Sequence, residues 1–120
     1  MASRKPSDPP ADLDAPGRAL WRRTVKALQG QSTWEDSDVG ALERYVRAVE
    51  RGRQAREARG GQLTAEGSQG QPTQHPNLRT EREADKDAHD FGRELLLSPA
   101  ARKRHEIEVR RGAGRFDGRL

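Results

Sequence analysis

The sequence predicts an all-α protein with about four helices per protomer, which completes its core against further copies of itself. Two observations support this prediction. Apolar residues recur with helical spacing in several segments, and stretches rich in Gly or Pro separate those segments. The strong core formers Leu, Val, Phe and Ile make up only 18 of 120 residues, below the roughly 20% at which chains begin to look disordered. A lone protomer could therefore bury little apolar surface.

The first half of the chain predicts a flexible, Pro-containing N-terminal arm at residues 1–15, followed by two helices. The first helix is expected at residues 16–29, with an apolar face made of Trp21, Val25 and Leu28. The second helix begins at residue 36 or 37 and continues to the Gly60-Gly61 stop. Its apolar seam consists of Val39, Leu42, Val46 and Val49, with Tyr45 beside it.

The second half predicts a long Gly-rich loop at residues 60–77, with room for a short hairpin around Leu63 and Thr64. A third helix follows from residue 78 or 80 to residue 96. A fourth runs from Pro99 to Arg111, and residues 112–120 form a flexible basic tail. Residues 16–111 thus form one helical DNA-binding and oligomerisation domain, in which the long second helix packs on the third. Its expected core and subunit seam comprise Val39, Leu42, Tyr45, Val46, Val49, Phe91 and Leu95.

Several classes of protein are excluded by composition. Cysteine is absent, which excludes a disulfide framework, a thiolate zinc site and a cysteine nucleophile. The longest apolar run, residues 95–97, is far shorter than the ~20 residues with which a helix crosses a bilayer. Residues 1–16 lack the apolar segment of a secretory signal. We therefore expect a soluble intracellular protein without a membrane partner.

The charge pattern indicates a polyanionic partner. Of 23 basic residues, 19 are arginine, whose planar fork suits phosphate. Residues 80–97 are acidic on balance and residues 99–120 are basic, which predicts complementary packing within the chain or between copies. The expected DNA contacts are Arg102, Lys103, Arg104, Arg110 and Arg111, with Arg51 and Arg53 as secondary contacts.

The arginines of the second helix also have an alternative interpretation. They spread over much of the helix circumference, and Glu43, Glu50 and Glu57 lie three or four residues from several of them. A solvated helix with internal salt bridges fits this pattern as well as a DNA-binding helix does. A helix-turn-helix from the first two helices is weakly indicated, because the start of the second helix is acidic where bases would lie.

Catalytic and metal sites have little support in the sequence, so we expect no enzyme activity, no cofactor and no metal. The Gly-rich loop lacks both the lysine and the preceding strand of a phosphate-binding loop. Asp85, Asp87, His89 and Asp90 could chelate a divalent ion, which leaves a metal-dependent nuclease as an alternative. A solvated acidic helix face explains the same residues, since metal sites need three or four converging ligands.

One sparse pattern runs across most of the chain. It consists of Leu20-Trp21, Leu28, Asp38, Leu42, Tyr45, His75-Pro76 and the block Leu96-Leu97-Ser98-Pro99-Ala100-Ala101-Arg102. In this order and spacing, over about residues 17–105, the sequence resembles the small terminase subunit of tailed bacteriophages. The pattern marks fold positions, so it identifies no DNA contacts.

The resemblance implies a non-enzymatic part of the viral DNA-packaging motor. Such subunits are helical, form homo-oligomeric rings and bind double-stranded viral DNA. They deliver that DNA to the large ATPase–nuclease subunit and regulate it, in the cytoplasm of the infected bacterial host. The alternative from another class is a small helical DNA-binding transcriptional regulator.

Overall fold

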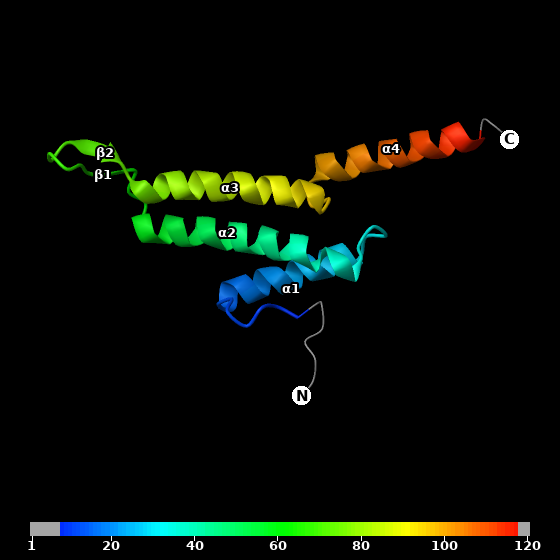
Figure 1. The fold of residues 1–120 in the computed structure, drawn as a ribbon, viewed down its shortest axis with the longest axis horizontal. Coiled ribbons are helices and arrows are strands. Elements are labelled where there is room, and N and C mark those ends of the chain that lie inside the picture. Colours follow the sequence, from blue (N-terminus) through cyan, green and yellow to red (C-terminus); the bar gives the residue numbers. More distant parts are fainter. Residues whose placement is uncertain (1–7, 118–120) are drawn as a thin grey trace.

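An antiparallel pair of long helices forms the centre of the molecule, and a third helix packs along one side of it (Figure 1). The computed structural model describes residues 8–117, with side chains to residue 112. The elements are α1 (Ala15–Gln29), the 3₁₀ turn η1 (Asp36–Asp38), α2 (Val39–Arg59), β1 (Thr64–Glu66), β2 (Pro72–Gln74), α3 (Pro76–Glu94) and α4 (Pro99–Asp117). The predicted helical character is confirmed, and a small two-stranded sheet is added to it.

Helix α1 starts where the sequence supplies a cap. The side chain of Asp14 accepts a hydrogen bond from the Gly17 amide at 3.0 Å, and Pro16 occupies the first turn. One face of the helix is buried, and Trp21 at its centre is fully enclosed. Trp21 and Leu28 form one core cluster with Leu42 of α2. The core thus lies between α1, α2 and the end of α3.

The seven residues expected in the core and subunit seam divide into two groups. Leu42, Val46 and Leu95 are buried in the core cluster. Val39, Tyr45, Val49 and Phe91 are only half-buried, and the first three of these lie against the cluster. The half-buried residues leave part of the α2–α3 seam in contact with solvent.

The connection between α2 and α3 forms a hairpin that begins at Thr64, where the sequence leaves room for one. Strands β1 and β2 pair antiparallel, with Ala65 opposite Thr73, and form an exposed hairpin at the far end of the molecule. Helix α3 begins at Pro76, earlier than predicted, because the His75 ring nitrogen accepts a hydrogen bond from the Asn77 amide at 3.1 Å. His75, which the sequence places in a loop, therefore caps a helix.

Part of the segment predicted as a flexible arm packs against the helices. Within it, Pro10 and Leu13 are buried, and Asp14 caps α1. Residues 8–14 therefore lie against the helices, whereas residues 1–7 fall outside the described part of the chain. Acidic and apolar side chains hold this segment against the helices. The high proline content of the stretch predicts flexibility and gives no sign of these contacts.

Helix α4 leaves the bundle at a sharp turn. The Leu97 amide donates to the Gly92 carbonyl at 2.8 Å, and Leu96 adopts a left-handed φ of 58°. The helix then extends away from α1–α3 and continues to Asp117 (Figure 1). The tail predicted from residue 112 is thus helical as far as residue 117, and residues 118–120 lie outside the described part.

The result is a thin, elongated molecule. Its principal extents are 73 × 44 × 16 Å, and its radius of gyration is 19.5 Å. A compact domain of this length would have a radius of gyration of roughly 14 Å. This shape follows from α4, which makes no extensive contact with another element in the described part of the chain.

Candidate nucleic-acid interface

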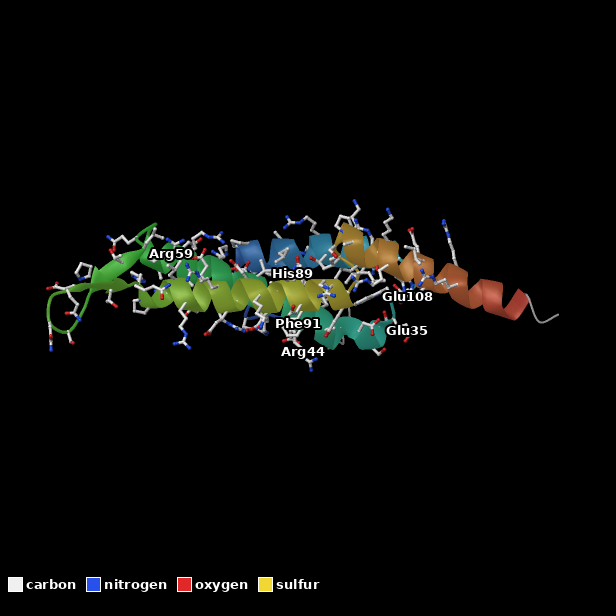
Figure 2. All side chains as sticks on the ribbon, turned by 90° about the horizontal axis from the view of Figure 1, so that it is seen from above. Glu35, Arg44, Arg59, His89, Phe91 and Glu108 are labelled. Carbon is white, nitrogen blue, oxygen red and sulfur yellow. The ribbon has the colours of Figure 1, made fainter. Side chains whose placement is uncertain are left out.

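Helix α4 presents an exposed basic surface. Residues 99–112 contain five basic side chains and only two acidic ones, Glu106 and Glu108. All five are exposed, namely Arg102, Lys103, Arg104, Arg110 and Arg111. Because α4 projects from the bundle, side chains extend from it into solvent on several sides (Figure 2). Their exposure leaves these cations accessible to an extended polyanion.

Arg102 differs from the other basic residues of α4 because the protein itself uses its guanidinium. The Nη1 atom donates to the Leu97 carbonyl at 2.9 Å and to the Leu96 carbonyl at 3.4 Å. The Gln31 side chain donates to the same Leu96 carbonyl at 3.2 Å. Arg102 therefore helps to hold the linker that sets the direction of α4.

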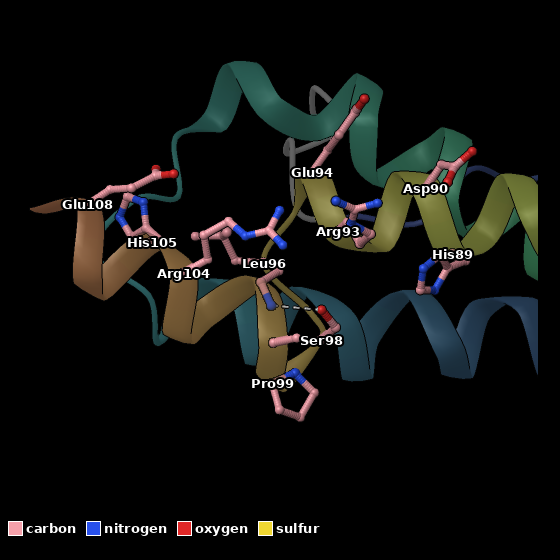
Figure 3. A pocket seen from close by; sticks show the side chains of 12 residues that line it. His89, Asp90, Arg93, Glu94, Leu96, Ser98, Pro99, Arg104, His105 and Glu108 are labelled. Carbon is pink, nitrogen blue, oxygen red and sulfur yellow. Dashed lines mark hydrogen bonds between the residues drawn. The ribbon is translucent and has the colours of Figure 1, made fainter.

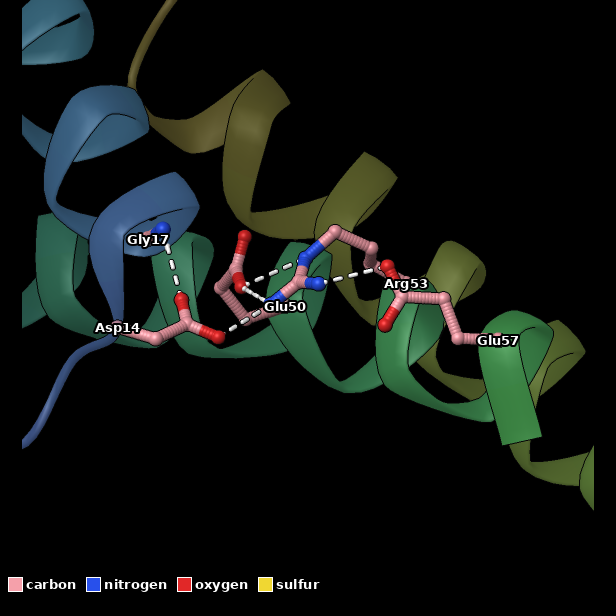
Figure 4. Close-up of polar contacts among 5 residues, drawn as sticks. All are labelled: Asp14, Gly17, Glu50, Arg53 and Glu57. Atoms are coloured by element: carbon pink, nitrogen blue, oxygen red, sulfur yellow. Dashed lines mark hydrogen bonds and ion pairs between the residues drawn. The ribbon is translucent and has the colours of Figure 1, made fainter.

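The second predicted group, Arg51 and Arg53 on α2, is less available. Arg53 binds the carboxylates of Asp14, Glu50 and Glu57, and its side chain is only 25% exposed (Figure 4). These hydrogen bonds, above all the one that Arg53 donates to Glu50, raise the pKa of Arg53. Arg51 makes a longer ion pair with Asp87, at 3.6 Å. A phosphate would compete with three carboxylates at Arg53 but with one distant carboxylate at Arg51.

Within the protomer, Glu81 and Asp87 of α3 pair with arginines of α2 and not with the basic helix α4, whereas complementary packing between copies stays a prediction. Glu81 accepts a hydrogen bond from Arg59 Nε at 2.7 Å and one from Arg56 Nε at 2.8 Å. These two bonds, the one from Arg59 first, hold the pKa of Glu81 below its ordinary value. Helix α4 cannot take this role because the turn at Leu96 directs it away from α3.

A further pair of charged residues joins the N-terminal segment to α2. Arg47 donates from both terminal nitrogens to the two carboxylate oxygens of Asp12, at 2.9 and 3.1 Å. It also binds Glu43 on its own helix. The hydrogen bonds to Asp12 and then Glu43 raise the pKa of Arg47. Arg47 and Arg44 belong to the arginines of the second helix, for which the sequence leaves both a salt-bridged and a DNA-binding interpretation open.

Comparison with known families identifies the family of this chain. Residues 17–111, which include most of α1, all of α2 and α3 and most of α4, match the family described as phage terminase, small subunit. The chain belongs to this family. The resemblance found in the sequence is thereby confirmed, and family membership supports a role in phage DNA packaging. Neither curated proteins nor solved structures give a match.

In this terminase small subunit, residues at the junction of α3 and α4 line a pocket of about 1040 Å³ that is open to solvent (Figure 3). Its lining mixes charges of both signs, from Asp90, Arg93, Glu94, Arg104 and Glu108. The Ser98 hydroxyl on its wall accepts a hydrogen bond from the Ala101 amide at 3.1 Å, which caps α4. The mixed lining offers no preference for a ligand of one charge.

The metal alternative gains no geometric support. Among the described residues, no group of three or more His, Asp or Glu side chains could hold a metal ion. Of the four candidates, Asp87 lies beside Arg51 and Asp85 lies close to Gly52 of α2. His89 and Asp90 line the junction pocket instead. The terminase small subunit likewise has, between residues 8 and 117, no helix long and apolar enough to span a membrane.

Proposed function

We propose that the protein is the DNA-binding small subunit of a phage packaging terminase, which acts as a homo-oligomeric ring. It binds double-stranded viral DNA, delivers it to the large ATPase–nuclease subunit and regulates that subunit. The small subunit itself is not an enzyme, and it works in the cytoplasm of the infected bacterial host. The observation that supports this proposal best is the exposed basic helix α4 in a chain of the terminase small subunit family.

The DNA contact assigned to α4 is a contact with the phosphate backbone. Arg and Lys side chains that reach phosphate oxygens position a protein on DNA without reading its sequence. Lys103, Arg104, Arg110 and Arg111 are exposed and make no ion pair within the described residues. Each phosphate that they neutralise releases counterions and makes the affinity more dependent on salt.

Two features of the protomer support the proposal of a ring, namely its thin shape and the apolar seam along α2 and α3. A protomer with an extent of only 16 Å in one direction cannot enclose its half-buried residues by itself. Tyr45, Val49 and Phe91 remain half-buried along α2 and α3, where a second copy would cover them. A ring also multiplies weak phosphate contacts, because the first contact raises the effective concentration of the others.

The DNA contact is tested with a double variant of α4. We expect Arg110→Ala/Arg111→Ala to weaken binding of a duplex and to reduce the slope of log K against log salt by up to about 1.8, at about 0.9 per lost phosphate contact. The affinity is measured by fluorescence anisotropy of a labelled duplex at several salt concentrations.

The matched control is Arg79→Ala/Arg82→Ala, which removes two exposed arginines from α3. The control should change the salt slope by less than half as much. Equal slopes for the wild-type protein and the α4 variant would remove Arg110 and Arg111 from the interface. A dimer that binds a short operator tightly, without any effect on a large subunit, would instead support the transcriptional regulator.

A further inference from the structure

Three arginines share the exposed side of α2. Arg44, Arg47 and Arg51 are spaced three and four residues apart, so they follow one another along a single stripe. The packed faces of α2 toward α1 and α3 carry other residues. Arg44 is exposed, points away from the helices (Figure 2), and makes no ion pair with another described side chain. We refer to Arg44, Arg47 and Arg51 as the arginine stripe.

The middle member of the arginine stripe already binds an anion in the geometry that a phosphate would use. Both terminal nitrogens of Arg47 donate to the two oxygens of Asp12. A phosphodiester presents the same pair of acceptor oxygens to a guanidinium fork. Asp12 therefore occupies, from within the chain, a site shaped for an oxyanion.

The neighbours of Asp12 hold it in place without burying it. Leu13 is 8% exposed and Asp14 caps α1, so the backbone that directly follows Asp12 is fixed. The side chain of Asp12 is 67% exposed and that of Arg47 is 40% exposed. Surface ion pairs of this kind are weak and screened by salt, so a dense row of phosphates can displace the carboxylate.

We propose that the arginine stripe is a second binding site for the phosphate backbone of duplex DNA, and that Asp12 is its internal competitor. The proposal deepens the proposed function and rests on it. Arg44 and Arg51 lie about 10 Å apart along the helix axis, at 1.5 Å per residue. This distance equals about three nucleotides of one DNA strand at 3.4 Å each.

Arg53 belongs to the other side of α2 and is not part of this site. Arg53 binds Glu50, whose side chain is 8% exposed, and it also binds Asp14 and Glu57. A buried carboxylate cannot leave its partner as easily as an exposed one, because its charge would remain without compensation. The structure thus separates Arg47, whose partners Asp12 and Glu43 are 67% and 40% exposed, from Arg53, whose partner Glu50 is buried.

The test is a cycle of variants at Asp12 and Arg47 in the full chain, with binding of a labelled duplex measured at several salt concentrations. We expect Asp12→Ala to tighten binding, by up to about fivefold if the surface pair contributes at the upper end of its usual range. The salt slope should steepen by up to about 0.9, because Asp12 no longer competes with a phosphate at Arg47. In an Arg47→Ala background, Asp12→Ala should lose this effect.

The matched control is Glu66→Ala, which removes one exposed carboxylate from the hairpin. It should leave the affinity within twofold of the wild-type protein. Arg44→Ala/Arg51→Ala should weaken binding and reduce the salt slope by up to about 1.8. Circular dichroism of each variant verifies that the helices are retained.

The outcomes distinguish this inference from the proposed function. If the wild-type protein binds duplex but Asp12→Ala leaves the affinity and slope unchanged, the arginine stripe is not a DNA site and the proposed function stands. If the gain persists without Arg47, it is a general charge effect and Asp12 is not a competitor. If the wild-type protein binds no duplex at low salt, both proposals fail.

Discussion

At the scale of single residues, the most consequential side chain is Glu81. It is nearly buried, with its side chain 9% exposed, and it joins α3 to two arginines of α2. Sequence patterns readily identify ion pairs within one helix, such as Arg47 with Glu43. They cannot identify the Arg59–Glu81 pair, whose members are 22 residues apart, because the register of two helices depends on how their apolar faces meet.

Replacement of Glu81 by Gln should lower stability at neutral pH. The pKa of Glu81 in the folded state lies below its ordinary value of 4.5, so the folded state binds this proton less tightly than the unfolded state does. The stabilisation is therefore complete above about pH 4.5 and is lost as the pH falls through the lowered pKa.

Urea denaturation of the wild-type protein and Glu81→Gln at pH 7 and pH 3 measures this effect. The two midpoints should differ at pH 7 and differ less at pH 3, because the stabilisation by the charge of Glu81 decreases once the pH is below the ordinary pKa of 4.5. A difference of the same size at both pH values would mean that the charge of Glu81 does not stabilise the α2–α3 contact.

At the scale of elements, the sequence predicted the positions of the helices better than their ends. Pro16, Pro99 and their capping residues marked the starts of α1 and α4 correctly, because these signals act locally. The end of α4 was wrong, since Gly112 weakens a helix without terminating it. The direction of α4 could not be predicted, because it depends on the turn at Leu96 and on carbonyl contacts from Gln31 and Arg102.

Helix α4 should be the least stable helix of the protomer. Helix α4 has 19 residues and makes no extensive contact with another described element. Its stability therefore depends on its N-terminal cap and on the helix propensity of its residues. We expect Ser98→Ala to cost α4 about 1 kcal/mol by removal of the hydroxyl that accepts from Ala101.

Amide hydrogen exchange of the free protein tests this directly. Exchange should accelerate by about fivefold in the first turns of α4 and remain unchanged in α1 and α2, which share the buried core. Uniform acceleration over all helices would show that α4 unfolds only together with the bundle.

At the scale of the whole molecule, the low content of core-forming residues corresponds to an open shape. The radius of gyration of 19.5 Å exceeds the roughly 14 Å of a compact chain of this length. The composition alone predicted that a protomer buries little apolar surface, because the number of apolar side chains limits the area that can be buried. It could not predict which surfaces stay open, since that depends on the three-dimensional path of α3 and α4.

We expect the protomer to be completed by other copies of the same chain. Native mass measurement of the purified protein, supported by sedimentation at micromolar concentration, tests this most directly. We expect one discrete particle that contains several protomers of 13.4 kDa each. A stable species of 13.4 kDa with full helical content, at every concentration examined, would contradict it.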